Sequence, residues 1–185
     1  MNRPLCTRAP AFRLGAAAVL AVLSAGCFSC RSAEIPFEAE ARRNNEAIQA
    51  YQEGQRLESE GKYEEALAVY ADALPYAQTH DAALYKRGRL ACLCGDWELA
   101  EAAFTLLLQD DPANTAVRQS LAYVYCQSDR EEEGLEAYRA LHEEKPHDEL
   151  IFQGYIKALK LNGLDEEAER EEEAYASLFP QRMSK

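Results

Sequence analysis

Positive charge is scarce in this sequence. Its 185 residues include 20 lysines and arginines against 32 aspartates and glutamates, so the formal net charge at pH 7 is -12. Three of the arginines lie in residues 1–26, which hold no acidic residue, and the rest of the chain therefore carries -15. Such a surface is soluble and repels phosphate backbones, which argues against nucleic-acid binding.

Motifs for catalysis and metal binding are missing as well. There is no glycine-rich phosphate loop and no Gly-x-Ser-x-Gly motif. None of the three histidines, His80, His142 and His147, has a suitable nucleophile beside it. His142 and His147 are five residues apart with Pro146 between them, so their imidazoles do not share the helical face that a zinc site needs. We expect no enzymatic activity, no cofactor and no metal, and we interpret the many carboxylates as solvated helix faces.

Three cysteines lie in the repeats, and their spacing argues against a shared metal for Cys92 and Cys94 and against a bridge between Cys92 and Cys126. Cys92 and Cys94 are two residues apart on a predicted helix, so they point about 200° apart and cannot chelate one metal. Cys92 and Cys126 are separated by 34 residues. If they lie on neighbouring helices about 8–10 Å apart, they exceed the ~7 Å limit between the Cα atoms of a disulfide. We therefore expect Cys92 and Cys126 to be small buried thiols.

The N-terminus has the layout of an export signal, residues 1–26. Three arginines precede a ten-residue apolar run, residues 14–23, and small residues follow it. Residues 23–27 read Leu-Ser-Ala-Gly-Cys, which resembles the lipobox of bacterial lipoproteins, with Ser24 where that motif usually has leucine. The resemblance implies cleavage before Cys27 and acylation of Cys27, for example by palmitate. Residues 27–36 would then be the lipidated cysteine and a tether.

Two alternatives to the lipoprotein remain open. Residues 14–30 are 17 uncharged residues, at the lower limit of the roughly 17 to 25 needed to span a bilayer, so an uncleaved anchor is possible. Ordinary signal cleavage is the other.

In the lipoprotein family an aspartate after the cysteine favours the inner membrane, and the residue here is Phe28. The resemblance thus predicts a lipid-anchored envelope protein, with the outer membrane favoured over the inner membrane.

The remaining chain repeats with a period of 34 residues. Segment 95–104 recurs one period earlier, so that Gly95, Trp97, Ala100 and Phe104 match Gly61, Tyr63, Ala66 and Tyr70. Pro112 recurs as Pro146 and Pro180. Glycine or aspartate heads each turn, and an aromatic, a small residue and a second aromatic follow. This pattern resembles the tetratricopeptide repeat (TPR) family, which implies an all-α, right-handed solenoid of about four helix-turn-helix repeats.

The register divides the chain into a helical lead-in and four repeats: 37–46, then 47–80, 81–114, 115–148 and 149–182. Pro75 predicts an early end for the second helix of repeat one. Glu172 occupies a position that is normally a buried aromatic, where an unpaired carboxylate would cost too much. We therefore predict that the last helix is a terminal cap with one solvated face, resting on Leu164, Ala168, Tyr175 and Leu178.

The resemblance also assigns a concave binding face, because positions 2, 5, 9, 12 and 13 of each repeat line it in this family. These positions hold Ile48, Tyr51, Gln55, Glu58 and Ser59; Ala82, Tyr85, Arg89, Cys92 and Leu93; Ala116, Gln119, Tyr123, Cys126 and Gln127; and Leu150, Gln153, Lys157, Lys160 and Leu161. The set has three cations and one acid, opposite in sign to the rest of the chain.

Nine of these residues are the predicted partner-binding groove: Tyr51, Gln55, Tyr85, Arg89, Gln119, Tyr123, Gln153, Lys157 and Lys160. They could hydrogen-bond an extended or helical peptide and attract its acidic groups. A simpler interpretation is that the tyrosines support helix packing and the lysines are solvated. We expect a non-enzymatic protein-protein interaction scaffold in an envelope complex. The alternative is a ligand carrier or accessory component of an envelope transport system.

Overall fold

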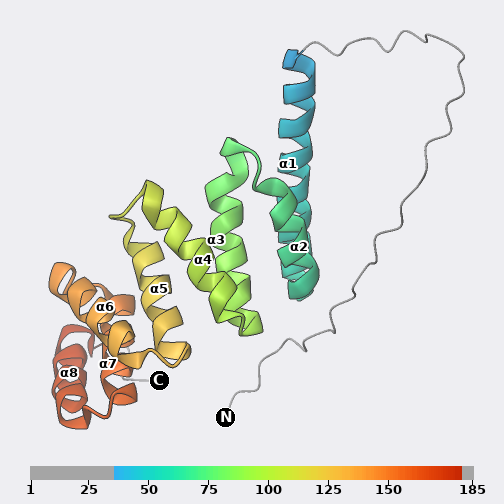
Figure 1. Ribbon diagram of the computed structural model, residues 1–185. Helices are drawn as coiled ribbons and strands as arrows, with labels where there is room; N and C mark the ends of the chain where they lie inside the picture. The colour runs from blue at the N-terminus through green and yellow to red at the C-terminus, as the bar shows by residue number, and fades with distance from the viewer. Residues whose placement is uncertain (1–35, 181–185) are drawn as a thin grey trace, which may run out of the picture.

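The computed structural model describes residues 36–180, which form eight helices and no strand (Figure 1). The predicted signal segment, Cys27 and most of the predicted tether lie outside these residues. Consecutive helices pair into four hairpins, with bounds α1 Pro36–Ser59 and α2 Tyr63–Ala73, α3 Ala77–Cys94 and α4 Trp97–Asp110, α5 Thr115–Gln127 and α6 Glu131–Glu144, and α7 Glu149–Leu161 and α8 Asp165–Leu178. The prediction of an all-α solenoid of helix-turn-helix repeats is confirmed.

Each hairpin turns at a residue in the left-handed conformation. Gly61, Gly95 and Gly163 have φ values of 75°, 75° and 71°, and Asp129 has a φ of 57°. These four residues are spaced by the 34-residue period of the sequence. Glycine adopts a positive φ without steric cost, and aspartate tolerates it better than most residues do. The turn chemistry seen in the sequence therefore determines where the chain reverses.

Short polar side chains begin three of the helices. The Asp96 carboxylate accepts a hydrogen bond from the backbone N–H of Leu99, and the Asn114 side chain accepts one from Val117. Asp148 does the same for the first turn of α7. Each cap satisfies a backbone donor that has no partner within the helix, which stabilises the start of α4, α5 and α7.

Glycines let large aromatic rings pack inside the first two hairpins. A Cβ atom added to Gly54 would lie 2.7 Å from the Tyr70 ring, and one added to Gly88 would lie 2.7 Å from the Phe104 ring. Both rings are fully buried. Only glycine leaves room for this approach, so the small residue of the repeat pattern sets the distance between the paired helices.

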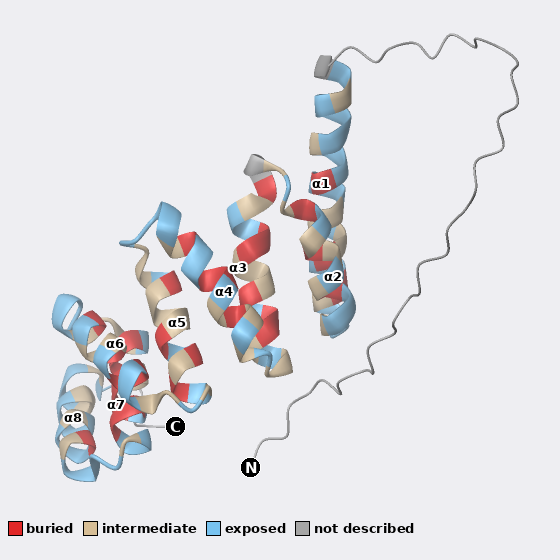
Figure 2. Cartoon of the chain, in the orientation of Figure 1, coloured by how far each residue is buried: buried red, intermediate tan, exposed pale blue. Residues whose placement is uncertain are grey.

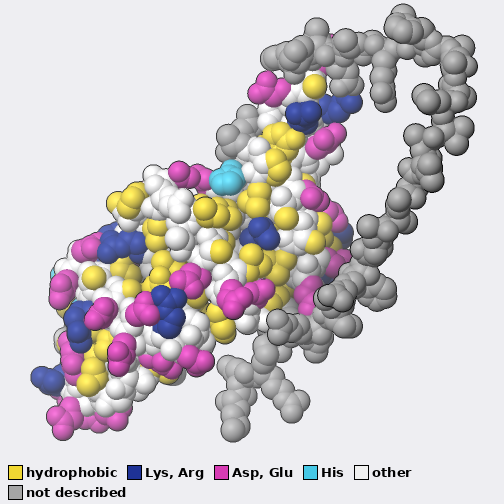
Figure 3. All heavy atoms as spheres, viewed as in Figure 1, with side chains coloured by type: hydrophobic (Ala, Val, Ile, Leu, Met, Phe, Trp, Pro, Cys, Tyr) yellow, Lys and Arg dark blue, Asp and Glu magenta, His cyan; other side chains and the backbone are white. Residues whose placement is uncertain are grey.

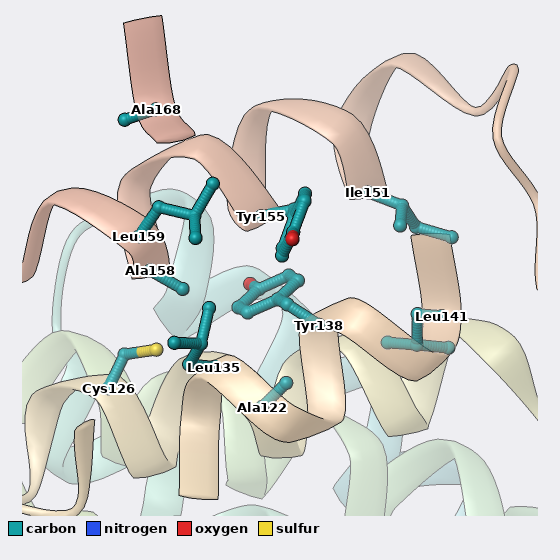
Figure 4. Close-up of a cluster of buried hydrophobic side chains, with 10 residues drawn as sticks. All are labelled: Ala122, Cys126, Leu135, Tyr138, Leu141, Ile151, Tyr155, Ala158, Leu159 and Ala168. Atoms are coloured by element: carbon teal, nitrogen blue, oxygen red, sulfur yellow. The ribbon is translucent and has the colours of Figure 1, made fainter. Parts of the chain in front are cut away.

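The core continues between hairpins rather than closing within each one (Figure 2). Figure 4 shows the part between the third and fourth hairpins, where Tyr138 of α6 and Tyr155 of α7 face each other. Leu135 and Leu141 of α6 meet Ile151 and the other apolar residues of α7 in the same cluster. Each repeat therefore completes the burial of its apolar surface by stacking on its neighbours, as expected for a solenoid.

The second helix of repeat one ends early, as predicted from Pro75. Helix α2 stops at Ala73, and its exposed carbonyls are taken up by the first turn of α3. The Thr79 hydroxyl donates to the Ala73 carbonyl over 2.6 Å, and Nδ1 of His80 lies 2.7 Å from the Leu74 carbonyl oxygen. Helix α3 consequently starts at Ala77, before the start of the sequence repeat.

The ends of the array differ from the prediction in part. Helix α1 is continuous from Pro36, so the lead-in belongs to the first helix of repeat one. In α8 only Ala168 is buried, whereas Leu164 and Leu178 are exposed, which makes their predicted role in supporting this helix wrong. Glu172 is exposed, as the cap prediction requires, and its carboxylate pairs with Lys160.

Candidate partner-binding face

The first helix of each hairpin lies on one side of the array. Helix α1 contacts α3, α3 contacts α5 and α5 contacts α7. Within residues 36–180, no contact of comparable extent joins α2 to α4, α4 to α6 or α6 to α8. The first helices are thus closer together than the second helices, which places them on the inside of the curved array. We call this side, with the twenty residues assigned to it from the sequence, the inner face.

The three tyrosines of the inner face are partly buried and contact the second helices. Tyr51 packs on Tyr70 with ring centroids 5.5 Å apart, and Tyr85 packs on Phe104 at 6.0 Å. Tyr123 meets the edge of the Trp97 ring at 6.3 Å. The interpretation that the tyrosines support packing therefore holds for Tyr51 and Tyr85. Tyr123 remains 45% exposed and is available for contact with a partner.

Exposed apolar side chains concentrate on the inner face. Among the large hydrophobic residues that are exposed in the described chain, five belong to it and three do not. The five are Ile48, Leu93, Tyr123, Leu150 and Leu161, and the three others are Leu106, Leu164 and Leu178. Figure 3 shows hydrophobic side chains gathered over the middle of the array and acidic ones frequent around its α6–α8 end. An apolar surface on one side of an otherwise acidic protein is typical of an interaction site.

Ion pairs reduce the charge that the inner face presents. Glu58 accepts from Lys86 over 2.8 Å and from the Tyr70 hydroxyl over 3.1 Å, so the only acid of the set is already paired. Lys160 pairs with Glu172 at 2.6 Å, which balances that cation. Arg89 and Lys157 are exposed, and no salt bridge engages either within the part of the chain that the structure describes. The remaining charge of the inner face is positive.

The glutamines of the predicted groove divide into two kinds. Gln55 is exposed and its side chain is open to solvent. Gln119 is half-buried, and its backbone carbonyl accepts from the Tyr138 hydroxyl over 3.5 Å. The Gln153 amide donates to the Tyr175 hydroxyl over 2.6 Å, which joins α7 to α8. The Gln153 side chain is therefore already hydrogen-bonded within repeat four. Among the three glutamines, Gln55 is the most available to a partner.

The thiols of Cys92 and Cys126 are free, in agreement with the prediction that no disulfide joins them. Cys126 is buried and Cys92 is partly buried. Burial raises the pKa of each thiol to about 11, so both are protonated at neutral pH. Burial also raises the pKa of Tyr123, and the neighbouring thiols of Cys92 and Cys126 add to that rise. Cys92 lies on α3, and Tyr123 and Cys126 lie on α5, which contacts α3.

Trp97 and Lys86 are two contributors that the sequence did not assign to this site. Trp97 was identified as a repeat position in the second helix, but its place at the start of α4 brings its ring to the edge of the inner face beside Tyr123. Lys86 reaches Glu58 from the next hairpin, a contact between residues 28 positions apart. In the sequence, the only indication of the Lys86–Glu58 pair is that the two side chains have opposite charges.

The described residues hold no cluster of three or more side chains that could ligate a metal ion. They also include no helix that is both long and apolar enough to cross a membrane. His142 packs its ring against Phe152 and Tyr155, with centroids 4.4 Å and 5.1 Å apart. This histidine therefore contributes to the packing between repeats three and four.

Neither protein-family models nor curated proteins match this chain. Solved structures do. The MamA protein from Desulfovibrio magneticus RS-1 superposes with a TM-score of 0.68 at 20% identity, over 80% of this chain and 84% of that one. A tetratricopeptide repeat protein from Parabacteroides merdae gives a TM-score of 0.68 at 21% identity, over 78% and 58%.

A third structure is YrrB, described as a TPR protein with an unusual peptide-binding site. It gives a TM-score of 0.60 at 21% identity, over 80% of this chain and 77% of that one. Together with the four stacked hairpins, these similarities show that the chain has the fold of the tetratricopeptide repeat proteins.

Proposed function

We propose that this protein is a non-enzymatic scaffold that binds a peptide segment of a partner protein along its inner face. The observation that carries the proposal is the combination, on a single face of an acidic protein, of five exposed apolar side chains with Arg89 and Lys157, two cations that form no salt bridge within residues 36–180. Apolar side chains supply binding free energy when a partner covers them, and the cations favour an acidic partner. The peptide-binding site named for YrrB, which has the same fold, supports this function.

Apolar burial on the inner face can supply part of the free energy of binding. Complete burial of a leucine or isoleucine contributes about 1.5–3 kcal/mol relative to leaving it exposed. Leu150 is 65% exposed and Leu161 51% exposed, so a partner that covers either gains a substantial part of this value. Several such contacts offset the cost of ordering a peptide, which is what distinguishes a binding face from a solvated surface.

A charge-reversal experiment tests the proposal. Tagged chains are captured from detergent-solubilised envelopes, and the variant Arg89→Glu with Lys157→Glu is compared with the control Lys145→Glu with Arg170→Glu. The control makes the same change in net charge at exposed positions outside the inner face. We expect wild type and control to retain one defined protein that the Arg89 and Lys157 variant loses, with unchanged circular dichroism. Equal retention by all three would place binding elsewhere.

We further propose that the scaffold is a lipid-anchored envelope protein, acylated at Cys27. The support is the sequence alone: three arginines, an apolar run and the segment Leu-Ser-Ala-Gly-Cys at residues 23–27. Phe28 favours the outer membrane in this proposal. Cys27→Ser is expected to abolish the acyl mass and to release the folded chain into the soluble fraction. Persistent membrane association without an acyl group would instead indicate an uncleaved anchor.

A further inference from the structure

We infer that the partner is anchored between repeats two and three, where Trp97, Tyr123 and Leu93 receive an apolar side chain and Arg89 pairs with a carboxylate next to it. We call these four residues the anchor patch. The inference rests on the proposed function and specifies its partner: a peptide segment in which an aliphatic or aromatic residue lies within a few positions of an acidic one.

The aromatic part of the anchor patch is an open pair of rings. The Trp97 and Tyr123 rings meet edge to face, with an interplanar angle of 70°, and they come from different repeats. Trp97 is partly exposed at the start of α4, and Tyr123 is about half exposed on α5. Two ring surfaces that meet at an angle leave contact area for a third apolar group. Tryptophan, tyrosine and arginine are also the residues most enriched at the energetic centres of interfaces.

The aliphatic and cationic parts lie on α3. Arg89 and Leu93 are four residues apart and thus occupy the same helical face, and Leu93 is 43% exposed. Cys92, the residue before Leu93, packs against the same core cluster as Trp97. Helix α3 also contacts α5, which carries Tyr123. The four residues of the anchor patch therefore lie at the junction of α3, α4 and α5.

Charge complementarity selects an acidic group as the neighbour of the apolar side chain. The only acid of the inner face, Glu58, is held by Lys86 and the Tyr70 hydroxyl. Arg89 is exposed and forms no salt bridge within residues 36–180, so it is available to pair with a carboxylate of the ligand. The Tyr123 hydroxyl is protonated at physiological pH, as a phenol with the usual pKa of about 10 already is, and burial raises its pKa further. It can therefore donate a hydrogen bond to the same carboxylate.

The N-terminal segment of the chain itself is a poor occupant on the same grounds. Residues 1–26 carry three arginines and no acidic residue, so they would bring positive charge to Arg89. The other exposed apolar positions also fit less well. Leu164 precedes α8 and Leu178 is its last residue, and the 14 residues of this helix include seven acids. A partner with the acidic chemistry inferred here is repelled from that end of the array.

A selection of random 12-residue peptides displayed on phage tests the inference, with the full chain held in detergent micelles as the target. Five chains are compared: wild type, Arg89→Glu, Tyr123→Ala, Lys157→Glu and Leu106→Ala. Leu106 is 47% exposed on α4 outside the inner face, which makes it the matched control for a lost apolar side chain. Peptides enriched on each chain are sequenced, and their affinities are measured by fluorescence anisotropy.

We expect wild type and Leu106→Ala to enrich the same motif, an apolar residue close to aspartate or glutamate. Arg89→Glu should weaken binding of that motif by more than tenfold and enrich lysine or arginine in place of the acid, because charge reversal changes specificity as well as affinity. Tyr123→Ala should lose the apolar preference. Leu93→Ala provides a second variant if Tyr123→Ala is not fully helical by circular dichroism.

The other outcomes each overturn a specific claim. If enriched peptides bind the Arg89 and Tyr123 variants as well as wild type but lose affinity in Lys157→Glu, the proposed function stands and the anchor patch is wrong. If wild type enriches nothing, or enriches peptides that bind every inner-face variant equally, both proposals fail. If the protein that wild type captures from solubilised envelopes is a second copy of this chain by mass, the surface is a self-association site.

Discussion

Repeats two and four share a backbone arrangement but are held together by different forces. In repeat two, α4 places Phe104 and Leu107 in the core together with two buried alanines, Ala100 and Ala103. In repeat four, α8 buries only Ala168 and makes one aromatic contact with α7, Tyr175 on Phe152. Its polar contacts with α7 join Tyr155 to Glu167, Lys160 to Glu172 and Gln153 to Tyr175. The comparison shows that the repeat pattern specifies the path of the chain, whereas the stability of each hairpin depends on what its second helix buries.

This difference has a consequence for function. The anchor patch lies where α3, α4 and α5 meet, in the part of the array whose second helix is fastened by apolar burial. A rigid support lowers the entropic cost of binding because the contacting side chains are already positioned. The acidic α8, in contrast, has one solvated face and the weaker attachment that suits the end of a solenoid.

Removal of the central aromatic of repeat two is expected to have the largest effect. Phe104→Ala leaves a cavity beside Gly88 and should lower the free energy of unfolding by about 3–5 kcal/mol. The exposed Glu172, at the equivalent position of repeat four, should be replaceable by alanine at a cost of about 0–1 kcal/mol. Urea unfolding followed by circular dichroism measures both, and equal costs would contradict the contrast between the two repeats.

A methyl group at Gly88 is expected to have the next largest effect. The added Cβ would lie 2.7 Å from the buried Phe104 ring, so Gly88→Ala should cost about 1–3 kcal/mol through overpacking, although alanine favours helix. The double variant Gly88→Ala with Phe104→Leu should recover part of the loss, since the smaller side chain makes room. Thermal unfolding measures the stability of the double variant and of both single variants. If the double variant loses as much as the two single variants together, the ring and the glycine do not interact.

A smaller effect is expected at the attachment of α8. Tyr155→Phe removes the hydrogen bond from the Tyr155 hydroxyl to Glu167, which should cost about 0.5–1.5 kcal/mol. In native-state hydrogen exchange, the amides of α8 should open at lower free energy than those of α4, and the variant should accelerate exchange in α8 more than in α4. Uniform acceleration throughout the chain would show that α8 unfolds together with the rest.

The smallest expected effect is on the acid limb of the stability curve. The Arg118 guanidinium holds the pKa of Glu144 below its ordinary value of 4.5 in the folded protein, through two hydrogen bonds. A carboxyl with a lowered pKa contributes stability above pH 4.5 and loses it as the pH falls through the folded value. Arg118→Met should therefore reduce the decline of the melting temperature below pH 4.5. An unchanged pH profile would show that the Arg118–Glu144 pair does not contribute to stability at low pH.

Much of the fold could be predicted from the sequence because the 34-residue period places chemically constrained residues at fixed points. Glycine or aspartate at the turns, and a small residue opposite an aromatic, have few structural alternatives. The early end of α2 was predicted for a similar reason, because Pro75 has no backbone N–H to continue the helix. Support of α8 by Leu164 and Leu178 was predicted wrongly, because hydrophobicity alone does not reveal which residues at the end of an array have a neighbour to cover them.

The candidate site was less accessible to sequence reasoning. Position in the repeat identified the residues of the inner face but not which charges remain free. Lys160 is paired by an acid twelve residues away, and Glu58 by a lysine in the next repeat. Trp97 was assigned only to the repeat pattern, because its exposure beside Tyr123 depends on how α4 and α5 meet. Pairing between repeats is a property of the stack, and a one-dimensional register does not contain it.

Site-specific photo-crosslinking tests the central claim most directly, that a partner protein contacts the inner face. A photoreactive phenylalanine is placed at Tyr123 on the inner face or at Leu106 on α4, and the cells that make the full chain are irradiated. The account predicts one defined protein adduct from position 123 that disappears with Arg89→Glu, and none from position 106. An adduct from position 106 without one from position 123 would contradict it.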